Sequence, residues 1–181
     1  KKVGGMVNII IPKQGIKRDL VLDAERNAKQ SLDRKMSESV TQKKLLCLAA
    51  ETFNLVSSLN RIEVYDNSHI QGTNAVGAMI VTGPEGFIKS DYRKYSINME
   101  DLDKKDDTAM MKYVFQRRFK FDKLKDKNHN LLKLPDLIIL DGGKGQLSVI
   151  SKFLASHGFD GIPIVAIAKG LNRHSGKERF F

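Results

Sequence analysis

Three aspartates lie at the ends of predicted elements, where a carboxylate can leave the protein core. Asp66 ends the apolar, strand-like run 61–66, and Asp141 ends the wholly apolar run 137–141 and precedes two glycines. Asp107 opens a helix-like run that extends to residue 115. Because Mg²⁺ and Mn²⁺ prefer hard oxygen ligands, carboxylates from three separate elements predict a site for one of these ions.

Such a site would serve phosphodiester hydrolysis. Crowded carboxylates repel one another, and a bound cation relieves that repulsion. The cation can activate a water and stabilise the charge that develops on a phosphate. Each aspartate also has a structural alternative. Asp66 could begin a turn with Asn67, and Asp141 could belong to a strand-ending loop. The role of Asp106 or Asp107 could be limited to capping a helix.

The charge of the chain favours a polyanionic partner. The 181 residues include 31 Lys and Arg against 21 Asp and Glu, a net charge of +10. Residues 112–133 alone contain eight basic residues and two acidic ones. A basic segment of this kind attracts phosphate backbones, although a solvated helix face followed by a lysine-rich loop would give the same composition.

Composition places the chain among globular proteins of a reducing compartment. It is 41% hydrophobic and 29% charged, which is typical of a folded domain rather than a disordered one. The single cysteine, Cys47, cannot form a disulfide within the chain, so a reducing cytosol fits best. No apolar run approaches the roughly 20 residues that span a bilayer, and no signal peptide is visible. Because the chain begins at Lys1 without Met, we expect it to be part of a longer protein.

The chain is predicted to contain an arm and a domain. Residues 1–60 form a mainly helical arm or linker, with a short strand at 6–11 and helices at 17–35 and about 39–58. Residues 61–181 form the domain. It has strands at 62–66, 75–82, 87–97, 137–140 and 163–168, with helices at 107–121 and 146–157.

The order of these domain elements is βββαβαβ, which predicts an α/β fold with an RNase H-like mixed sheet. Three antiparallel strands form a meander, and two parallel strands are added by helical crossovers. The first and fourth strands are then parallel neighbours whose carboxyl ends share one edge. Asp66 and Asp141 would meet there, and the first domain helix could bring Asp107 over the same edge.

The glycine-rich run 141–145 matches neither common nucleotide-binding template, G-x-x-x-x-G-K-[ST] or G-x-G-x-x-G. Its glycines are expected to allow close backbone approach of a metal or substrate. Lys144 could contact a phosphate or be a plain surface residue. His69, three residues after Asp66, could face the site or be a hydrogen-bonded structural residue.

Several motifs together resemble one family. They are Asp66-Asn-Ser-His69, Tyr92-Arg93, Asp106-Asp107 with Met110, Arg117-Arg118, and the run 135–147 with its Asp-Gly-Gly-Lys-Gly-Gln. In these motifs the chain is similar to the C-terminal half of UvrC, the nuclease subunit of bacterial nucleotide excision repair. The resemblance covers nearly the whole chain.

The resemblance implies an RNase H-like endonuclease domain that cuts damaged double-stranded DNA 5′ to a lesion. By motif match, the catalytic and metal-binding residues are Asp66, Asp107 and Asp141, and the cofactor is Mg²⁺ or Mn²⁺. Asp106 is then free to cap its helix, and both Asp106 and His69 could support the metal ligands. The residues expected to contact the DNA backbone are Arg93, Arg117, Arg118 and Lys144.

The resemblance also implies partners: UvrB, bound through a region absent here, and the UvrA pathway. The implied location is the bacterial cytoplasm, with no membrane involved. One departure from the family is Asn67, where isoleucine is usual. Another is a further catalytic histidine, in an Arg-Asp-Glu-x-His-Arg-Phe stretch that this sequence lacks. We therefore expect an intact metal site with weak cutting or none.

Two other hypotheses stay open at this point. The chain could be a catalytically incomplete DNA-binding or assembly module whose carboxylates are structural. It could also be a small-molecule phosphotransferase on a related sheet, although the missing nucleotide loop argues against that.

Overall fold

The computed structural model describes residues 10–70, 74–98, 100, 102, 106–120, 133–168 and 179–181. By its internal contacts, the chain divides into residues 1–41 and residues 42–181. The helices and strands that follow the first helix all belong to the second unit. The predicted boundary between an arm and a domain at residues 60 and 61 stays a prediction.

The first helix is α1 (Ile16–Thr52), a single helix of 37 residues. Our prediction of two helices, at 17–35 and 39–58, was wrong. Residues 35–39 contain neither glycine nor proline, and the exposed ion pair between Arg34 and Glu38 spans the proposed break at helical i, i+4 spacing. Nothing in the local sequence therefore ends the helix there.

The predicted strand at 6–11 lies largely outside the described residues. Its last two residues, Ile10 and Ile11, are described and are not in a strand. Leu20, Leu32 and Met36 are exposed on α1.

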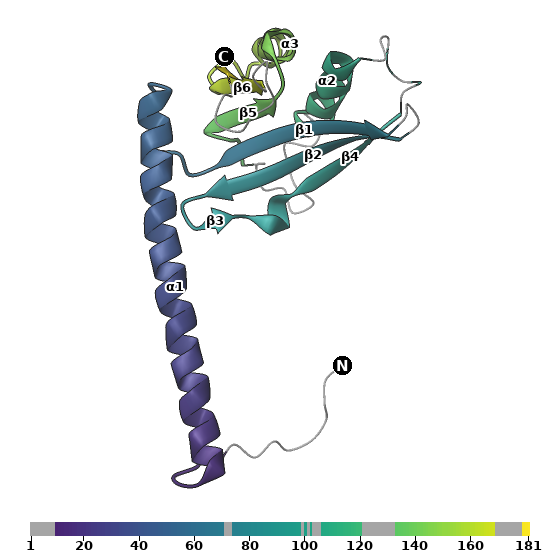
Figure 1. Cartoon of the computed structure of the whole chain (residues 1–181). Helices are drawn as coiled ribbons and strands as arrows, with labels where there is room; N and C mark the ends of the chain where they lie inside the picture. The colour runs from purple at the N-terminus through teal and green to yellow at the C-terminus, as the bar shows by residue number, and fades with distance from the viewer. Residues whose placement is uncertain are drawn as a thin grey trace. The chain divides into compact units, whose positions relative to one another are not determined.

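The second unit is built on a seven-stranded mixed sheet with the order β3-β2-β1-β5-β6-β7, and β4 pairs with β2 (Figure 1). The strands are β1 (Ile62–Ile70), β2 (Asn74–Gly83), β3 (Gly86–Phe87), β4 (Arg93–Ile97), β5 (Leu137–Asp141), β6 (Ile164–Ala168) and β7 (Arg179–Phe180). The helices are the short 3₁₀ helix η1 (Lys89–Asp91), α2 (Asp107–Arg118) and α3 (Lys144–Ser156).

The predicted α/β fold class is confirmed. β1 and β4 both pair antiparallel with β2, and β1, β5 and β6 are parallel. The predicted third strand, 87–97, is split by η1 into β3 and β4. The last strand, β7, was not predicted, because two residues are too short to give a periodic pattern.

Apolar side chains fill both faces of this sheet. On one face, α2 and α3 cover Tyr65, Ile138 and Leu140, and the two helices lie on the same side of the sheet in Figure 1. On the other face, Ile62 and Leu137 pack with Leu46 from the last turns of α1. This alternation along β1 and β5 is what a strand buried on both faces requires.

One close approach seats α2 on the sheet. A Cβ atom added to Gly77 on β2 would lie 2.3 Å from a methyl carbon of Val114 on α2. Only a glycine therefore lets the helix come this near the strand, and the buried side chains of Val114 and Phe115 fill the contact.

Candidate functional site

Asp66 and Asp141 lie on adjacent parallel strands. Tyr65 on β1 is in register with Leu140 on β5, so the next residue on each strand is one of the two aspartates. Neighbouring strands are roughly 4.8 Å apart. The structure thus brings together two of the three predicted carboxylates, as the strand order implied.

The same two aspartates belong to one face of the sheet and are accessible to solvent. Side chains alternate along a strand, so Asp66 follows the face of Val64, and Asp141 follows that of Ile139; both of these apolar residues pack against the Leu46 side of the sheet. Both aspartates are exposed. A ligand can therefore reach their carboxylates from solvent at this edge.

Asp107 belongs to a different element. It is the first residue of α2 and is exposed, and α2 covers the face of the sheet that contains Tyr65. The residue before it, Asp106, caps the helix: its carboxylate accepts a hydrogen bond from the backbone N–H of Ala109, at 2.7 Å. The prediction that Asp106 caps the helix is confirmed, and the carboxylate of Asp107 is not needed for that purpose.

Within the described ranges, no three side chains of His, Cys, Asp and Glu gather closely enough to hold a metal ion together. The side chain of His69 is not among those that the structure describes. The chemistry of the donor set fits Mg²⁺ or Mn²⁺, because Asp66 and Asp141 are hard, exposed oxygen donors on neighbouring strands. The three-aspartate metal site and the supporting role of His69 stay predictions.

The turn after Asp141 is held by Gln146. Its side-chain oxygen accepts a hydrogen bond from the backbone N–H of Gly143, at 3.1 Å, and so caps the start of α3. A Cβ atom on Gly142 would lie 1.5 Å from that same oxygen. A side chain on residue 142 would push the Gln146 amide out of this hydrogen bond, whereas Gly143 has open space around its Cα atom.

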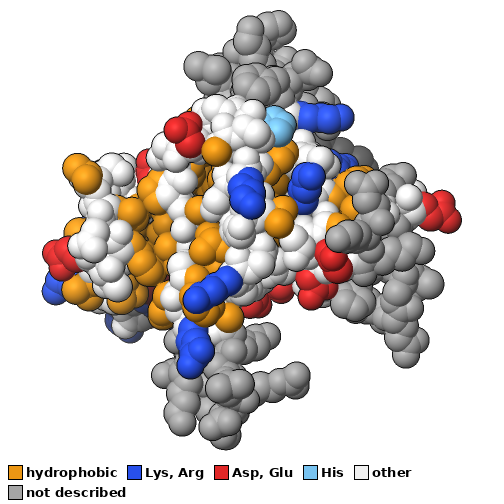
Figure 2. Space-filling view, turned by 90° about the horizontal axis from the view of Figure 1, so that it is seen from above, with side chains coloured by type: hydrophobic (Ala, Val, Ile, Leu, Met, Phe, Trp, Pro, Cys, Tyr) orange, Lys and Arg blue, Asp and Glu red, His pale blue; other side chains and the backbone are white. Residues whose placement is uncertain are grey.

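Three of the four basic residues predicted to contact DNA are exposed: Arg93, Arg117 and Lys144. Arg117 donates a hydrogen bond to the backbone oxygen of Ser96 and lies near two tyrosine rings. Lys144 stands at the start of α3, close to the edge that contains Asp141. On the face drawn in Figure 2, Lys and Arg side chains are spread among apolar ones rather than joined in one patch.

Arg118 requires a correction. We predicted a DNA contact, but its side chain is buried (4% exposed) and bound to Glu63 on β1. Its Nη2 atom lies 2.7 Å from one carboxylate oxygen of Glu63, and its Nε atom lies 3.2 Å from the other. A guanidinium held in this way cannot reach a phosphate while the domain is folded.

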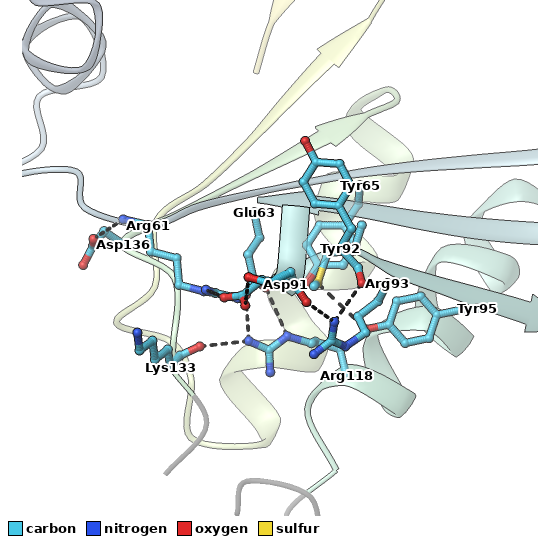
Figure 3. Close-up of polar contacts among 12 residues, drawn as sticks. Arg61, Glu63, Tyr65, Asp91, Tyr92, Arg93, Tyr95, Arg118, Lys133 and Asp136 are labelled. Atoms are coloured by element: carbon cyan, nitrogen blue, oxygen red, sulfur yellow. Dashed lines mark hydrogen bonds and ion pairs between the residues drawn. The ribbon is translucent and has the colours of Figure 1, made fainter. Parts of the chain in front are cut away.

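Glu63 is the centre of a polar network that the sequence analysis missed (Figure 3). Its fully buried carboxylate also accepts hydrogen bonds from Tyr65 Oη, at 2.6 Å, and from Arg61 Nε, at 3.0 Å. Arg61 in turn pairs with Asp91 of η1. The available signal was that Glu63 shares the inward-facing alternation of Tyr65, so its charge had to be buried.

These contacts shift several pKa values. Burial raises the pKa of the Tyr65 hydroxyl well above its ordinary value, and the charge of Glu63 adds to that rise. Burial alone would lower the pKa of Arg118, but the hydrogen bonds and charge of Glu63 outweigh it and raise that pKa. The hydrogen bond from Arg61 lowers the pKa of Asp91.

None of the helices in the described part of the chain has the length and apolarity needed to cross a membrane.

Comparison with known proteins gives one family. Residues 50–181 match the family described as "UvrC RNAse H endonuclease domain". The chain is 51% identical over 99% of its length to the UvrABC system protein C of Ruegeria pomeroyi, and 49% identical over 99% of its length to that of Caulobacter vibrioides. It spans 29% and 28% of the length of these two relatives.

Solved structures give a weaker likeness. Endonuclease V of Ciona intestinalis, in complex with an inosine-containing DNA, is 17% identical, with a TM-score of 0.44 over 64% of this chain and 48% of that one. The catalytic domain of human endonuclease V is 17% identical, with a TM-score of 0.39 over 78% of this chain and 59% of that one. At these scores the likeness carries no argument.

The family match covers most of the chain. The two curated relatives align with nearly all of it, and about half of the aligned residues are identical. The chain belongs to the UvrC RNase H endonuclease domain family.

Proposed function

We propose that this chain is the DNA-cutting domain of a UvrABC-type excision nuclease and that it hydrolyses a phosphodiester 5′ to a lesion. The observation that carries the proposal is the parallel pairing of β1 with β5, which places Asp66 and Asp141 side by side at an exposed edge. Membership of the UvrC RNase H endonuclease domain family supports it.

Asp66 and Asp141 would hold Mg²⁺ or Mn²⁺, and Asp107 from the start of α2 would be the third ligand. The bound ion would activate a water and stabilise the negative charge that develops on the phosphate. Without a counter-charge, two carboxylates on adjacent strands would repel an approaching phosphate, so the ion is also needed for substrate binding.

The surrounding residues would bind and orient the DNA backbone. Lys144 follows Asp141 closely in the chain, and Arg117 and Arg93 are exposed on α2 and β4. Arg117 donates one N–H of its guanidinium to Ser96, and a guanidinium has five such donors, so others would bind a phosphate. The glycines after Asp141 let the DNA backbone come close to the carboxylate.

The relatives support a proposal for the partners and the setting. Proteins named UvrABC system protein C are the matches over the whole chain, so we propose damaged double-stranded DNA as the substrate, with UvrB and the UvrA pathway as partners. The bacterial cytoplasm, where the chromosome lies, is the proposed location.

The test is 5′ incision of a duplex with a single lesion, by the full-length protein with its UvrA and UvrB. Asp141→Ala should lower the incision rate about a thousand-fold, equivalent to roughly 4 kcal/mol of transition-state stabilisation. The matched control is Asp160→Asn, an exposed aspartate after α3 that lies in no proposed site, and it should cut at the wild-type rate. Undiminished cutting by Asp141→Ala would sink the assignment.

A further inference from the structure

The proposed chemistry leaves one buried acid unused. Glu63 lies on β1 three residues before Asp66, and its side chain has no exposed surface. Arg118, in the last turn of α2, donates two hydrogen bonds to Glu63, one to each carboxylate oxygen. Such a two-point contact fixes the orientation of the two groups as well as their distance.

This ion pair is a poor source of net stability. Taking both charges out of water costs several kcal/mol per ion, and their attraction offsets that cost only if every polar atom finds a partner. Arg118 Nη1 is buried and has no acceptor among the described residues. The pair therefore contributes little beyond what two apolar side chains would give.

The pair does determine where α2 lies along β1. If the helix slid along the strand, both charges would stay buried but lose their partner, which is a strongly unfavourable state. The backbone oxygen of Lys133 also accepts a hydrogen bond from Arg118 Nη2, at 3.0 Å, and so holds the guanidinium from a second side. In Figure 3 the guanidinium lies between Glu63 and Lys133.

A second contact lies nearer the start of α2. In the orientation that satisfies both ends of its amide, Asn67 on β1 accepts a hydrogen bond from the backbone N–H of Met111, at 3.0 Å. Its amide nitrogen then lies 3.3 Å from the backbone oxygen of Asp66. The strand that contains Asp66 is thus tied to α2 at two points.

The helix transmits this placement to the proposed site. Arg118 is the last residue of α2 and Asp107 is the first. A helix rises about 1.5 Å per residue and is stiff over this length, so fixing Arg118 on β1 also fixes the distance from Asp107 to Asp66.

We propose that Glu63 and Arg118 are positioning residues that set the register of α2 on β1 and thereby fix the position of Asp107 relative to Asp66 and Asp141. The inference rests on the proposed function, because it gives a reason for the placement of Asp107. Neither residue touches the DNA or the metal in this account.

The test replaces the ion pair with a neutral one, in the double variant Glu63→Gln with Arg118→Met. The amide oxygen of the new Gln would accept from Arg61, and its NH2 group would donate to Tyr65 Oη. No buried charge is then left alone, and cooperative unfolding should be retained. We expect the dissociation constant for Mn²⁺ to rise about 10-fold and the kcat of incision to fall about 10- to 100-fold, the usual range for residues that orient metal ligands. The KM for DNA should not change.

A readout that needs neither metal nor DNA accompanies these measurements. In the metal-free double variant, amide hydrogen exchange in the first turn of α2 should be faster by about 10-fold, because that end is held less firmly. Arg118→Lys, which keeps the charge but loses the two-point contact, should give smaller changes of the same sign.

Arg61→Met is the matched control. It removes a guanidinium from the same carboxylate, but Arg61 directly precedes β1 and pairs with η1 rather than α2. It should lower stability while leaving kcat and the affinity for Mn²⁺ unchanged. An equal loss of kcat in Arg61→Met would show that the network acts through general stability, and the inference would be wrong.

The failures of the two proposals are distinguishable. Suppose that Asp141→Asn abolishes incision, while the double variant Glu63→Gln with Arg118→Met cuts DNA and binds Mn²⁺ like the wild type. Only the positioning role is then overturned. If Asp141→Asn cuts normally, the proposed function fails first.

Discussion

Strand β1 contains two acidic residues, Asp66 and Glu63, in opposite situations. Asp66 is exposed at the edge shared with Asp141, whereas Glu63 is fully buried and bound by two arginines and a tyrosine. The exposed acids can be reached by a ligand, and the buried acid is already satisfied by the protein. The difference teaches that acidic residues three positions apart on one strand can be open to a ligand or part of the folded core, and that the face of the strand decides which.

The largest expected difference concerns stability. Arg118→Met leaves the buried carboxylate of Glu63 without its main partner and should lower the free energy of unfolding by about 3–5 kcal/mol. Asp66→Asn, at an exposed position, should change it by about 0.5 kcal/mol or less. Urea denaturation of the two variants measures both values. Equal losses would contradict the contrast between the two groups.

The fold and the exposed group could largely be predicted from the sequence. The apolar run that became β5 is a typical central strand, and the order of strands and helices placed Asp141 beside Asp66. Whether a carboxylate stands at the end of a strand depends on the neighbouring residues, so it can be inferred from the sequence.

The buried group could not be predicted in the same way, because the partner of a charged side chain is a tertiary property. Arg118 was assigned to DNA on the strength of the surrounding basic residues. Its spacing from Met111 and Phe115 places it on the same face of the helix as these two buried residues, and that spacing was the overlooked signal. The continuity of α1 was missed as well, although Leu32, Met36 and Val40 continue the four-residue apolar spacing across the proposed break and no residue there ends a helix.

The buried contact under α2 and the exposed edge beside Asp141 should also differ, by a smaller amount of stability, in how well they tolerate an added methyl group. Gly77→Ala would push a Cβ atom into Val114 under α2 and should cost about 1–3 kcal/mol, because the buried helix cannot move aside. Gly143→Ala, beside the exposed edge, has nothing within 4 Å of its added carbon and should be neutral. Thermal unfolding compares them, and a neutral Gly77→Ala would show that α2 is more loosely seated than described.

The smallest effect is on pH dependence. Tyr65→Phe removes the hydrogen bond to Glu63 and should cost about 1 kcal/mol near neutral pH. The folded-state pKa of Tyr65 lies well above its unfolded value of 10.0, so its contribution is fully present below pH 10 and is lost as the pH rises toward the folded value. The stability difference between wild type and variant should therefore shrink above pH 10. A difference that stays constant up to pH 11 would contradict the burial of this hydroxyl.

The most direct test of the central claim is a Mn²⁺ titration, followed by electron paramagnetic resonance, of wild type, Asp66→Asn, Asp141→Asn and the control Asp160→Asn. If Asp66 and Asp141 share a metal ion, each of their variants should bind Mn²⁺ at least about 10-fold more weakly, and the control should match the wild type. Unchanged Mn²⁺ affinity in either Asp66→Asn or Asp141→Asn would contradict the account.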